Sequence, residues 1–121
     1  MSLNRDYASV LDIDKAISHI IEYVEGYDRA SFFQDSKTQS AVIYQIAIIG
    51  EATKRLSQEY RTKYPEIAWS LMAGMRDKLV HDYDNLDLER IWMTVSQAIP
   101  DLSNKLKPLL DEINQSWYIP E

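Results

Sequence analysis

The chain has 121 residues, a length that suits one domain spanning residues 1–121 and allows a hydrophobic core without staples. It contains no cysteine, which excludes disulfides and thiolate metal sites and fits a reducing cytoplasm, where we expect the protein to reside. The formal net charge of -6 argues against a protein that grips nucleic acid over its whole surface.

Neither a targeting segment nor a membrane span is predicted. The first ten residues, MSLNRDYASV, lack the basic and apolar regions of a signal peptide. The longest apolar stretch, AVIYQIAII at 41–49, is nine residues long and contains Gln45. A helix that crosses a bilayer needs roughly 20 apolar residues, so we expect no membrane association.

Charge is unevenly distributed along the chain. Positions 54–78 hold six basic and three acidic residues, a local balance of +3 that leaves -9 for the rest. A local basic patch can bind phosphate even when the whole chain is acidic. From charge alone, a solvated surface of mixed sign is at least as good an interpretation. The basic residues are Lys54, Arg55, Arg61, Lys63, Arg76 and Lys78.

The first helix is predicted from about Asp6 to Glu25, with Gly26 as its stop signal. Its apolar residues recur at spacings of three and four and form one stripe, namely Val10, Ile13, Ile17, Ile20, Ile21 and Val24. The next segment, 26–38, is predicted to be a loop with a short turn. We expect Phe32 and Phe33 to plug the core there.

A second helix is predicted to begin near Ser36 or Thr38, either of which could cap it, and to end at about Ser57. Residues 41–49 are apolar almost all round, which predicts the central and most buried helix. Gly50 lies inside it, although a helical glycine costs about 1 kcal/mol relative to alanine. We favour the interpretation that Gly50 is a small residue at a helix crossing.

The segment 60–69 is predicted to be a connector, in which Pro65 can start the next helix. A third helical segment covers 67–80 and leads into a polar break at 81–87. Candidate caps for the last helix are Asn85 and Asp87.

Pro100 should kink the last helix, because its ring removes one backbone donor and crowds the preceding turn. The tail, 116–121, is predicted to be irregular. These elements predict an all-α fold, an up-and-down bundle of four main helices with short helical turns. The apolar face of the last helix is formed by Leu88, Ile91, Trp92, Val95, Ile99, Leu102, Leu106 and Ile113.

One short stretch, RDKLVHDY at 76–83, places Arg76, His81 and Tyr83 within eight positions. Arg76 and His81 are five residues apart, roughly 140° around an unbroken helix. They converge only if the helix ends between them or if a second chain supplies one of them. The polar run after Val80 favours an ending there. Asp77, four residues before His81, could accept a hydrogen bond from the imidazole and favour its charged form.

These residue types fit metal-free cleavage of RNA. That reaction needs a base for the 2′-hydroxyl proton, an acid for the leaving 5′-oxygen and positive charge beside the phosphate. Histidine titrates near neutrality, with a reference pKa of about 6.5, and arginine binds phosphate with a planar fork. One chain offers a single histidine here, so we predict a composite site in a two-fold homodimer, where a second copy brings its own His81 and Arg76.

Purely structural roles for the same residues stay open. An arginine and a histidine near a helix end are more often structural than catalytic, and Tyr83 could pack against the arginine stem. His19 fits a surface or partly buried position in the first helix. The two histidines lie 62 positions apart and make no metal cluster, and DYDNLDLE lacks the glycine and the final acid of a calcium loop, where Val95 stands. We expect neither a metal nor a cofactor.

The chain resembles a known family in several segments. Arg76, His81 and Tyr83 match the R-x4-H-x-Y motif of HEPN-domain proteins. More narrowly, the sequence resembles the HepT toxins that pair with minimal nucleotidyltransferase (MntA-type) antitoxins. The likeness covers nearly the whole chain and rests on IGEATKRLS at 49–57, YPEIAW at 64–69, RDKLVHDY at 76–83 and IW at 91–92.

The resemblance implies a HEPN fold of four or five helices, a homodimer with facing motifs, and a metal-independent ribonuclease toxin that acts on tRNA or mRNA. It implies that Arg76 and His81 are the catalytic pair and that Asp77 orients the site. It also implies that the cognate nucleotidyltransferase attaches AMP to Tyr83, adding a negative, bulky group that would block RNA. Further RNA contacts are expected at Lys54, Arg55 and Lys78.

A second function of another class stays open. The chain could be a non-catalytic helical adapter that holds a nucleotidyltransferase or presents it with nucleotide, with Arg76 binding phosphate without cutting. The acids Asp82, Asp84 and Asp87 disfavour close approach of RNA and could face solvent or the antitoxin.

Overall fold

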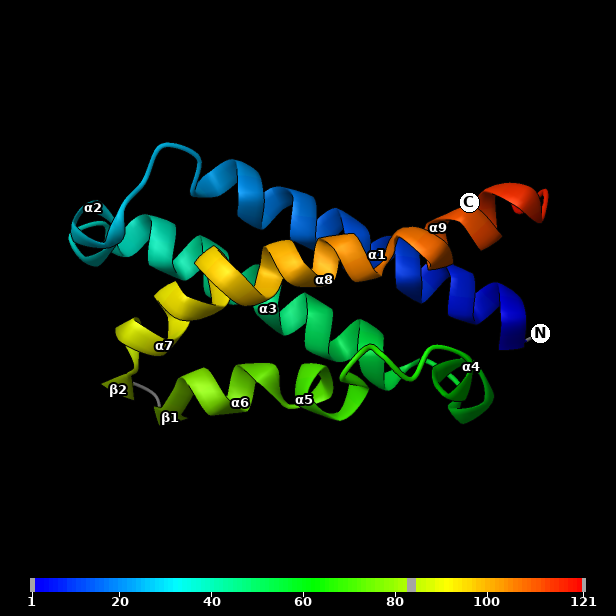
Figure 1. Cartoon of the computed structure of the whole chain (residues 1–121). Helices are drawn as coiled ribbons and strands as arrows, with labels where there is room; N and C mark the ends of the chain where they lie inside the picture. Colours follow the sequence, from blue (N-terminus) through cyan, green and yellow to red (C-terminus); the bar gives the residue numbers. More distant parts are fainter. Residues whose placement is uncertain (1, 83–84, 121) are drawn as a thin grey trace.

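The computed structural model describes residues 2–82 and 85–120 and confirms the all-α class (Figure 1). The elements in chain order are α1 (Ser2–Tyr23), α2 (Arg29–Phe33), α3 (Ser36–Lys54), α4 (Gln58–Lys63), α5 (Trp69–Ala73), α6 (Met75–Leu79), β1 (Val80–Asp82), β2 (Asn85–Leu86), α7 (Leu88–Met93), the π-helical turn η1 (Thr94–Ala98), α8 (Ile99–Lys105) and α9 (Lys107–Gln115). None of the described helices is long and apolar enough to cross a membrane.

The long direction of the molecule is shared by four helical rods that alternate in direction (Figure 1). The first two are α1 and α3. The α5–α6 rod and the α7–α9 rod, the latter running from α7 through η1 and α8 to α9, complete the bundle. The predicted up-and-down arrangement of four main helices is therefore confirmed. One end carries the β1–β2 hairpin, and the opposite end carries α4 and α9 (Figure 1).

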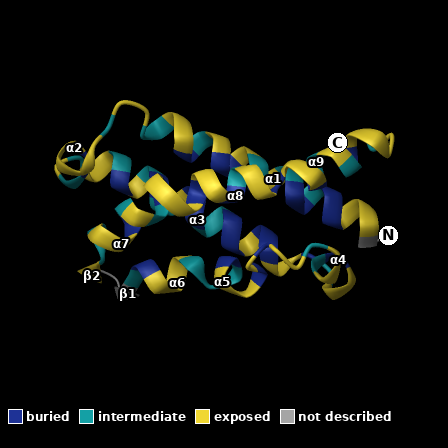
Figure 2. Ribbon diagram, viewed as in Figure 1, coloured by how far each residue is buried: buried dark blue, intermediate teal, exposed yellow. Residues whose placement is uncertain are grey.

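The core lies between the rods, where buried residues face inward along each helix (Figure 2). In α1 the predicted stripe is confirmed at Val10, Ile13, Ile17 and Ile20, which are almost wholly buried. Ile21 is the exception, with an exposed fraction of 44%. This stripe packs against α3, so the two longest helices of the fold share one buried face.

The first helix begins at Ser2, not near Asp6, and ends at Tyr23, two residues before the predicted Glu25. The second begins at Ser36, as predicted, but its cap is Asp35, whose carboxylate accepts the Thr38 N–H at 3.1 Å, and not Ser36 or Thr38. An aspartate at the N-cap satisfies a backbone donor that the helix itself leaves unpaired.

The predicted connector after α3 contains a helix of its own. Ser57 caps α4 by accepting the Tyr60 N–H at 3.1 Å, so α3 ends three residues before Ser57. Pro65 does not start the next helix, which begins at Trp69. The Trp69 indole instead donates to the carbonyls of Arg61 and Tyr64, each at 3.0 Å. These hydrogen bonds hold the connector against the start of α5.

Gly50 lies at a helix crossing, as predicted. A Cβ at this position would lie 3.3 Å from the Ala73 carbonyl oxygen and 3.5 Å from that of Met72. A side chain at this position would require the α5 backbone to move by a few tenths of an ångström, which favours glycine here. The predicted third helix, 67–80, is broken into α5 and α6 at Gly74.

The α7–α9 rod bends before Pro100, as predicted, and the bend takes the form of the π-helical turn η1. A proline ring crowds the carbonyl one turn earlier, and a π turn relieves that crowding.

The described tail, 116–120, is irregular as predicted. Phe32 is fully buried and its ring lies 5.3 Å from that of Trp92, whereas Phe33 is only partly buried.

Candidate active site

The α6 helix ends between the two residues predicted to be catalytic. Its last residue is Leu79, and Val80 has an extended backbone with φ -126° and ψ 108°. The Val80 N–H donates to the carbonyl of Arg76 and closes the last turn. The predicted helix ending between Arg76 and His81 is therefore confirmed, and the angle that would separate them on one unbroken helix no longer applies.

The chain then forms a short hairpin that the sequence did not predict. Val80 pairs with Leu86 and Asp82 pairs with Asn85 in an antiparallel register. The main chain of His81 belongs to β1. The side chains of His81 and Asp82, and all of Tyr83 and Asp84, lie outside the described residues. The convergence of His81 on Arg76 and the accessibility of Tyr83 thus stay predictions.

Arg76 presents its guanidinium to solvent. Its side chain is 58% exposed, and one nitrogen lies 3.6 Å from a carboxylate oxygen of Asp77, itself 75% exposed. An exposed ion pair of this kind contributes about 0–1 kcal/mol. The pair therefore leaves the guanidinium available to a stronger anionic partner, such as a phosphodiester.

The basic stretch 54–78 is divided between the two ends of the molecule (Figure 1). Lys54 and Arg55 lie at the end of α3 beside α4, and they pair with Glu51 at 3.6 Å and Asp12 at 3.1 Å. Lys78 is exposed on α6, close to Arg76 in the chain. Within one chain Lys78 shares α6 with Arg76 but is about 200° around the helix from it, and Lys54 and Arg55 lie at the other end of the molecule (Figure 1).

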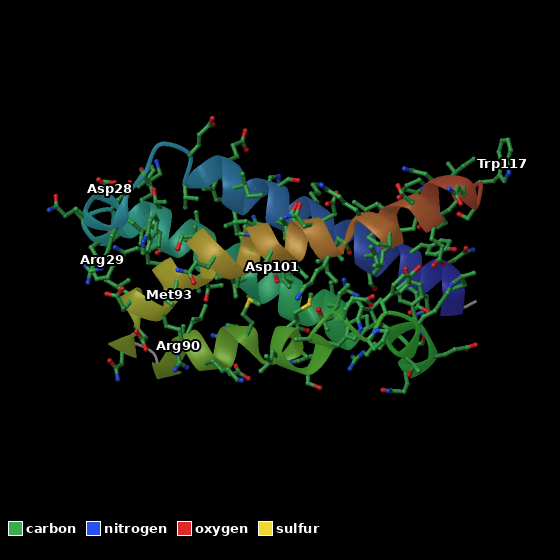
Figure 3. All side chains as sticks on the ribbon, viewed as in Figure 1. Asp28, Arg29, Arg90, Met93, Asp101 and Trp117 are labelled. Atoms are coloured by element: carbon green, nitrogen blue, oxygen red, sulfur yellow. The ribbon has the colours of Figure 1, made fainter. Side chains whose placement is uncertain are left out.

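Arg90 was not among the predicted site residues, yet it reaches the end of α6 (Figure 3). Its guanidinium donates to the Lys78 carbonyl at 3.4 Å and lies 3.9 Å from the Asp87 carboxylate. Asp87 caps α7 by accepting the Arg90 N–H at 3.1 Å, as predicted for one of the two cap candidates. The sequence signal for this pair was the spacing of three between acid and base at a helix start.

An ion pair between Arg29 and Glu89 links α7 to α2. Arg29 donates from Nε to the Glu89 carboxylate at 3.0 Å and stacks 4.4 Å above the Phe33 ring. The hydrogen bond from Arg29 lowers the pKa of Glu89 below its ordinary value. Both side chains are more than half exposed, so this tie orients α7 without forming part of the core.

Another polar cluster lies at the opposite end of the bundle, around Glu112 of α9. Its carboxylate accepts hydrogen bonds from Tyr7 at 2.7 Å, from Lys63 at 2.9 Å and from Tyr64. Burial would raise the pKa of Glu112, but these donors outweigh burial and lower it. Burial also raises the pKa of Tyr60 and Tyr64 well above ordinary tyrosine values. These contacts join α1, α4 and α9.

Among the side chains that the structure describes, which do not include those of residues 81–84, no group of three or more histidine and acidic residues is placed to hold a metal ion. His19 lies on α1, partly buried and stacked on Tyr23 with ring centroids 5.9 Å apart, which agrees with the structural role predicted for it.

Comparison with known proteins identifies the family. The family model described as "Ribonuclease HepT-like" matches residues 13–109. The chain belongs to the HepT-like ribonuclease family. The junction of α6 and the hairpin, which carries the R-x4-H-x-Y motif, lies within the matched range.

Individual relatives agree with this assignment. A protein of Thermococcus cleftensis named "Probable ribonuclease HepT" is 42% identical over 88% of this chain and 94% of its own length. Relatives with provisional RNase names occur in Methanocaldococcus jannaschii, 35% identical over 88% of both chains, and in Caldanaerobacter subterraneus, 38% identical over 77% of this chain and 83% of the relative. No solved structure matches the chain significantly.

Proposed function

We propose that this protein is a metal-independent ribonuclease toxin whose active site contains Arg76 and His81. The observation that carries the proposal is the end of α6 at Leu79, which turns the main chain between an exposed arginine and the histidine. In a member of the HepT-like ribonuclease family, a helix that ends between these two residues supports the proposal that the Arg76 guanidinium and the His81 imidazole act on the same phosphodiester.

The proposed reaction is attack of a 2′-hydroxyl on the neighbouring phosphodiester of tRNA or mRNA. A neutral His81 takes the 2′-hydroxyl proton as the new phosphorus–oxygen bond forms. A protonated imidazole gives a proton to the 5′-oxygen as its bond to phosphorus breaks. Arg76 stabilises the extra negative charge on the phosphate oxygens between these steps. Asp77, 3.6 Å from Arg76, would keep the guanidinium oriented until RNA displaces it.

One chain supplies one His81, while the acid and base roles are two. We therefore propose that the active form is a homodimer in which both copies of the motif surround one phosphodiester. Asp87 should oppose the approach of RNA less than an unpaired carboxylate would, because it accepts the Arg90 N–H and lies 3.9 Å from the Arg90 guanidinium.

Cleavage of RNA in the presence of EDTA tests the catalytic assignment. We expect the wild-type protein to cut tRNA or mRNA, and Arg76→Ala and His81→Ala to lose about 100- to 1000-fold in rate. Arg5→Ala is the matched control, since Arg5 is an exposed arginine on α1 and should leave the rate unchanged. Full activity in both site variants would remove these residues from the mechanism. An inert wild-type protein would favour the adapter role instead.

Mixing wild-type and His81→Ala chains tests the composite site. After random subunit exchange, one quarter of the dimers in an equimolar mixture contain two wild-type chains. If two histidines serve one phosphodiester, the mixture should therefore retain about one quarter of the activity of wild-type protein at the same total concentration. A site contained in one chain predicts about one half. Native mass spectrometry of the mixture shows whether exchange is complete.

Regulation is proposed to act through Tyr83. A cognate MntA-type nucleotidyltransferase would transfer AMP from ATP to the tyrosine hydroxyl, with loss of pyrophosphate. The added phosphodiester charge and adenosine, two residues from His81, would repel and block the RNA backbone. Intact mass spectrometry should show steps of one adenylyl group on the wild-type protein and none on Tyr83→Phe. No mass change with an active partner enzyme would contradict this proposal.

A further inference from the structure

The base of the β1–β2 hairpin is closed by two contacts that come from the first turn of α7. The Asp87 N–H donates to the Leu79 carbonyl at 3.1 Å. The Arg90 guanidinium donates to the Lys78 carbonyl at 3.4 Å. Carbonyls in the last turn of a helix have no partner within the helix, so α6 depends on outside donors at its end.

Asp87 and Arg90 also hold each other. One carboxylate oxygen of Asp87 accepts the Arg90 N–H at 3.1 Å, and the other lies 3.9 Å from Nε of the guanidinium. The carboxylate therefore caps α7 and aims the arginine at α6 in the same geometry. We define the Asp87–Arg90 clamp as these two residues with the carbonyls of Lys78 and Leu79.

Buried residues of α6 and α7 anchor the clamp to the core. Leu79, whose carbonyl belongs to the clamp, is 2% exposed, and Ile91, which follows Arg90 on α7, is 0% exposed. The Arg29–Glu89 ion pair fixes the other side of α7 to α2. The donors and acceptors of the clamp are thus tied to the core, although the Arg90 side chain is 56% exposed.

The described residues between the two contact points form the strands β1 and β2, and β1 includes the main chain of His81. Arg76 lies on the preceding turn, and its carbonyl accepts the Val80 N–H. Any shift of the hairpin base therefore changes the separation between Arg76 and His81 directly.

We propose that Asp87 and Arg90 are positioning residues, which set the geometry between Arg76 and His81 by clamping the hairpin to α6. This inference rests on the ribonuclease function proposed above and deepens it. Neither residue needs to touch RNA in this role. A misplacement of about 1 Å in a catalytic group can cost about 100-fold in rate, which shows why such a clamp would matter.

Steady-state kinetics of Arg90→Met and Asp87→Ala test the proposal. We expect kcat to fall about 10- to 100-fold with KM changed by less than about twofold, since positioning affects the reacting groups and not the uniform binding of RNA. Asp87→Asn should lose less, because asparagine still caps α7. The double variant should lose little more than either single variant, because both residues serve one clamp.

Asp101→Asn provides the matched control. Asp101 and Lys105 form an exposed ion pair of 3.1 Å on α8, similar in type to the Asp87–Arg90 pair but away from the hairpin base (Figure 3). Its kcat should equal that of the wild type. An unchanged kcat in Arg90→Met and Asp87→Ala overturns the proposal. So does a raised KM at unchanged kcat, which would make Arg90 an RNA contact.

Hydrogen exchange separates this proposal from the proposed function. Amides in β1 and β2 should exchange at least about 10-fold faster in Arg90→Met than in the wild type, while amides in α1 and α3 keep their rates. Unchanged hairpin exchange overturns the clamp whether or not the protein cleaves RNA. Faster exchange in a protein that is inert on RNA would support the clamp and reject the nuclease.

Discussion

The two ends of the bundle use polar side chains in opposite ways. At the hairpin end, Arg76 and Arg90 are more than half exposed, and their ion pairs are loose, at 3.6 and 3.9 Å. At the α4–α9 end, Glu112 is partly buried and accepts close hydrogen bonds from Tyr7, Tyr64 and Lys63. At the first end the exposed Arg76 guanidinium is accessible to a ligand, whereas at the second end the polar groups around Glu112 join helices.

Under the proposed function, the most strongly raised pKa values lie away from the active site. Burial raises the pKa of Tyr60 and Tyr64 strongly, and both lie in the Glu112 cluster, far from the hairpin (Figure 1). Ion-pair and hydrogen-bond networks that hold a fold together shift pKa values as active sites do.

The largest expected effect is on RNA cleavage, at the hairpin end, whereas variants at the α4–α9 end should change stability. Arg76→Ala should lower the rate of RNA cleavage by about 100- to 1000-fold, because the charge on the phosphate loses its partner. Its free energy of unfolding should stay within about 0.5 kcal/mol of the wild type, since the side chain is exposed. Tyr64→Phe should do the reverse, losing stability and keeping activity. Urea unfolding and cleavage assays on both variants check this crossover.

A substitution at the middle of the molecule should affect both readouts. Gly50→Leu places a side chain where even a Cβ would lie 3.3 Å from the Ala73 carbonyl, so α5 must move away from α3. We expect a loss of about 2–3 kcal/mol in unfolding free energy. The α5–α6 rod carries Arg76, so cleavage should fall as well. Ala47→Leu, at a partly buried position on the same helix, is the control for added bulk. Unchanged stability in Gly50→Leu would refute the tight crossing.

Local patterns predicted the parts of the fold that local physics controls. The apolar stripe of α1, the end of α6 before His81 and the bend before Pro100 all follow from spacing, polarity or backbone chemistry within a few residues. The motif itself was visible in the sequence because Arg76 and His81 are close in the chain. Their side-chain geometry stays a prediction.

What the sequence did not reveal depends on contacts between distant segments. Tyr7 and Glu112 are 105 positions apart, so no local period marks their hydrogen bond. The helix α4 was missed because only six residues form it, and its stability comes from tertiary contacts such as that of Ser57 with Asp6. The hairpin was missed because strands of three and two residues show no alternation.

A smaller effect is expected from the Glu112 cluster. Glu112→Gln should lower the unfolding free energy at neutral pH by about 1–2 kcal/mol, because it removes a charged acceptor of three hydrogen bonds. The pKa of Glu112 is lowered in the folded state, so its contribution is complete above the unfolded value and is lost as pH falls through the folded value. The gap between wild type and variant should therefore close below about pH 4.

The control for this pH dependence is Glu89→Gln, at the hairpin end. Glu89 also has a lowered pKa, through Arg29, but its ion pair is exposed and solvent screens it. Its variant should lose far less stability at neutral pH. Equal losses in the two variants would contradict the contrast between a structural and an open end.

The smallest expected effect has the opposite sign. Among the residues that the structure describes, the buried Tyr60 hydroxyl has no hydrogen-bond partner, although its ring packs against Tyr7 and Tyr64. A buried polar group without a partner costs about 1–3 kcal/mol, while the ring contributes packing. Tyr60→Phe keeps the ring and removes the hydroxyl, so the unfolding free energy should rise by about 1 kcal/mol. Tyr64→Phe makes the same chemical change in a hydroxyl that donates to Glu112, and should lower stability instead. Thermal unfolding of both variants at neutral pH gives the comparison, and a loss in Tyr60→Phe would mean that its hydroxyl is satisfied in solution.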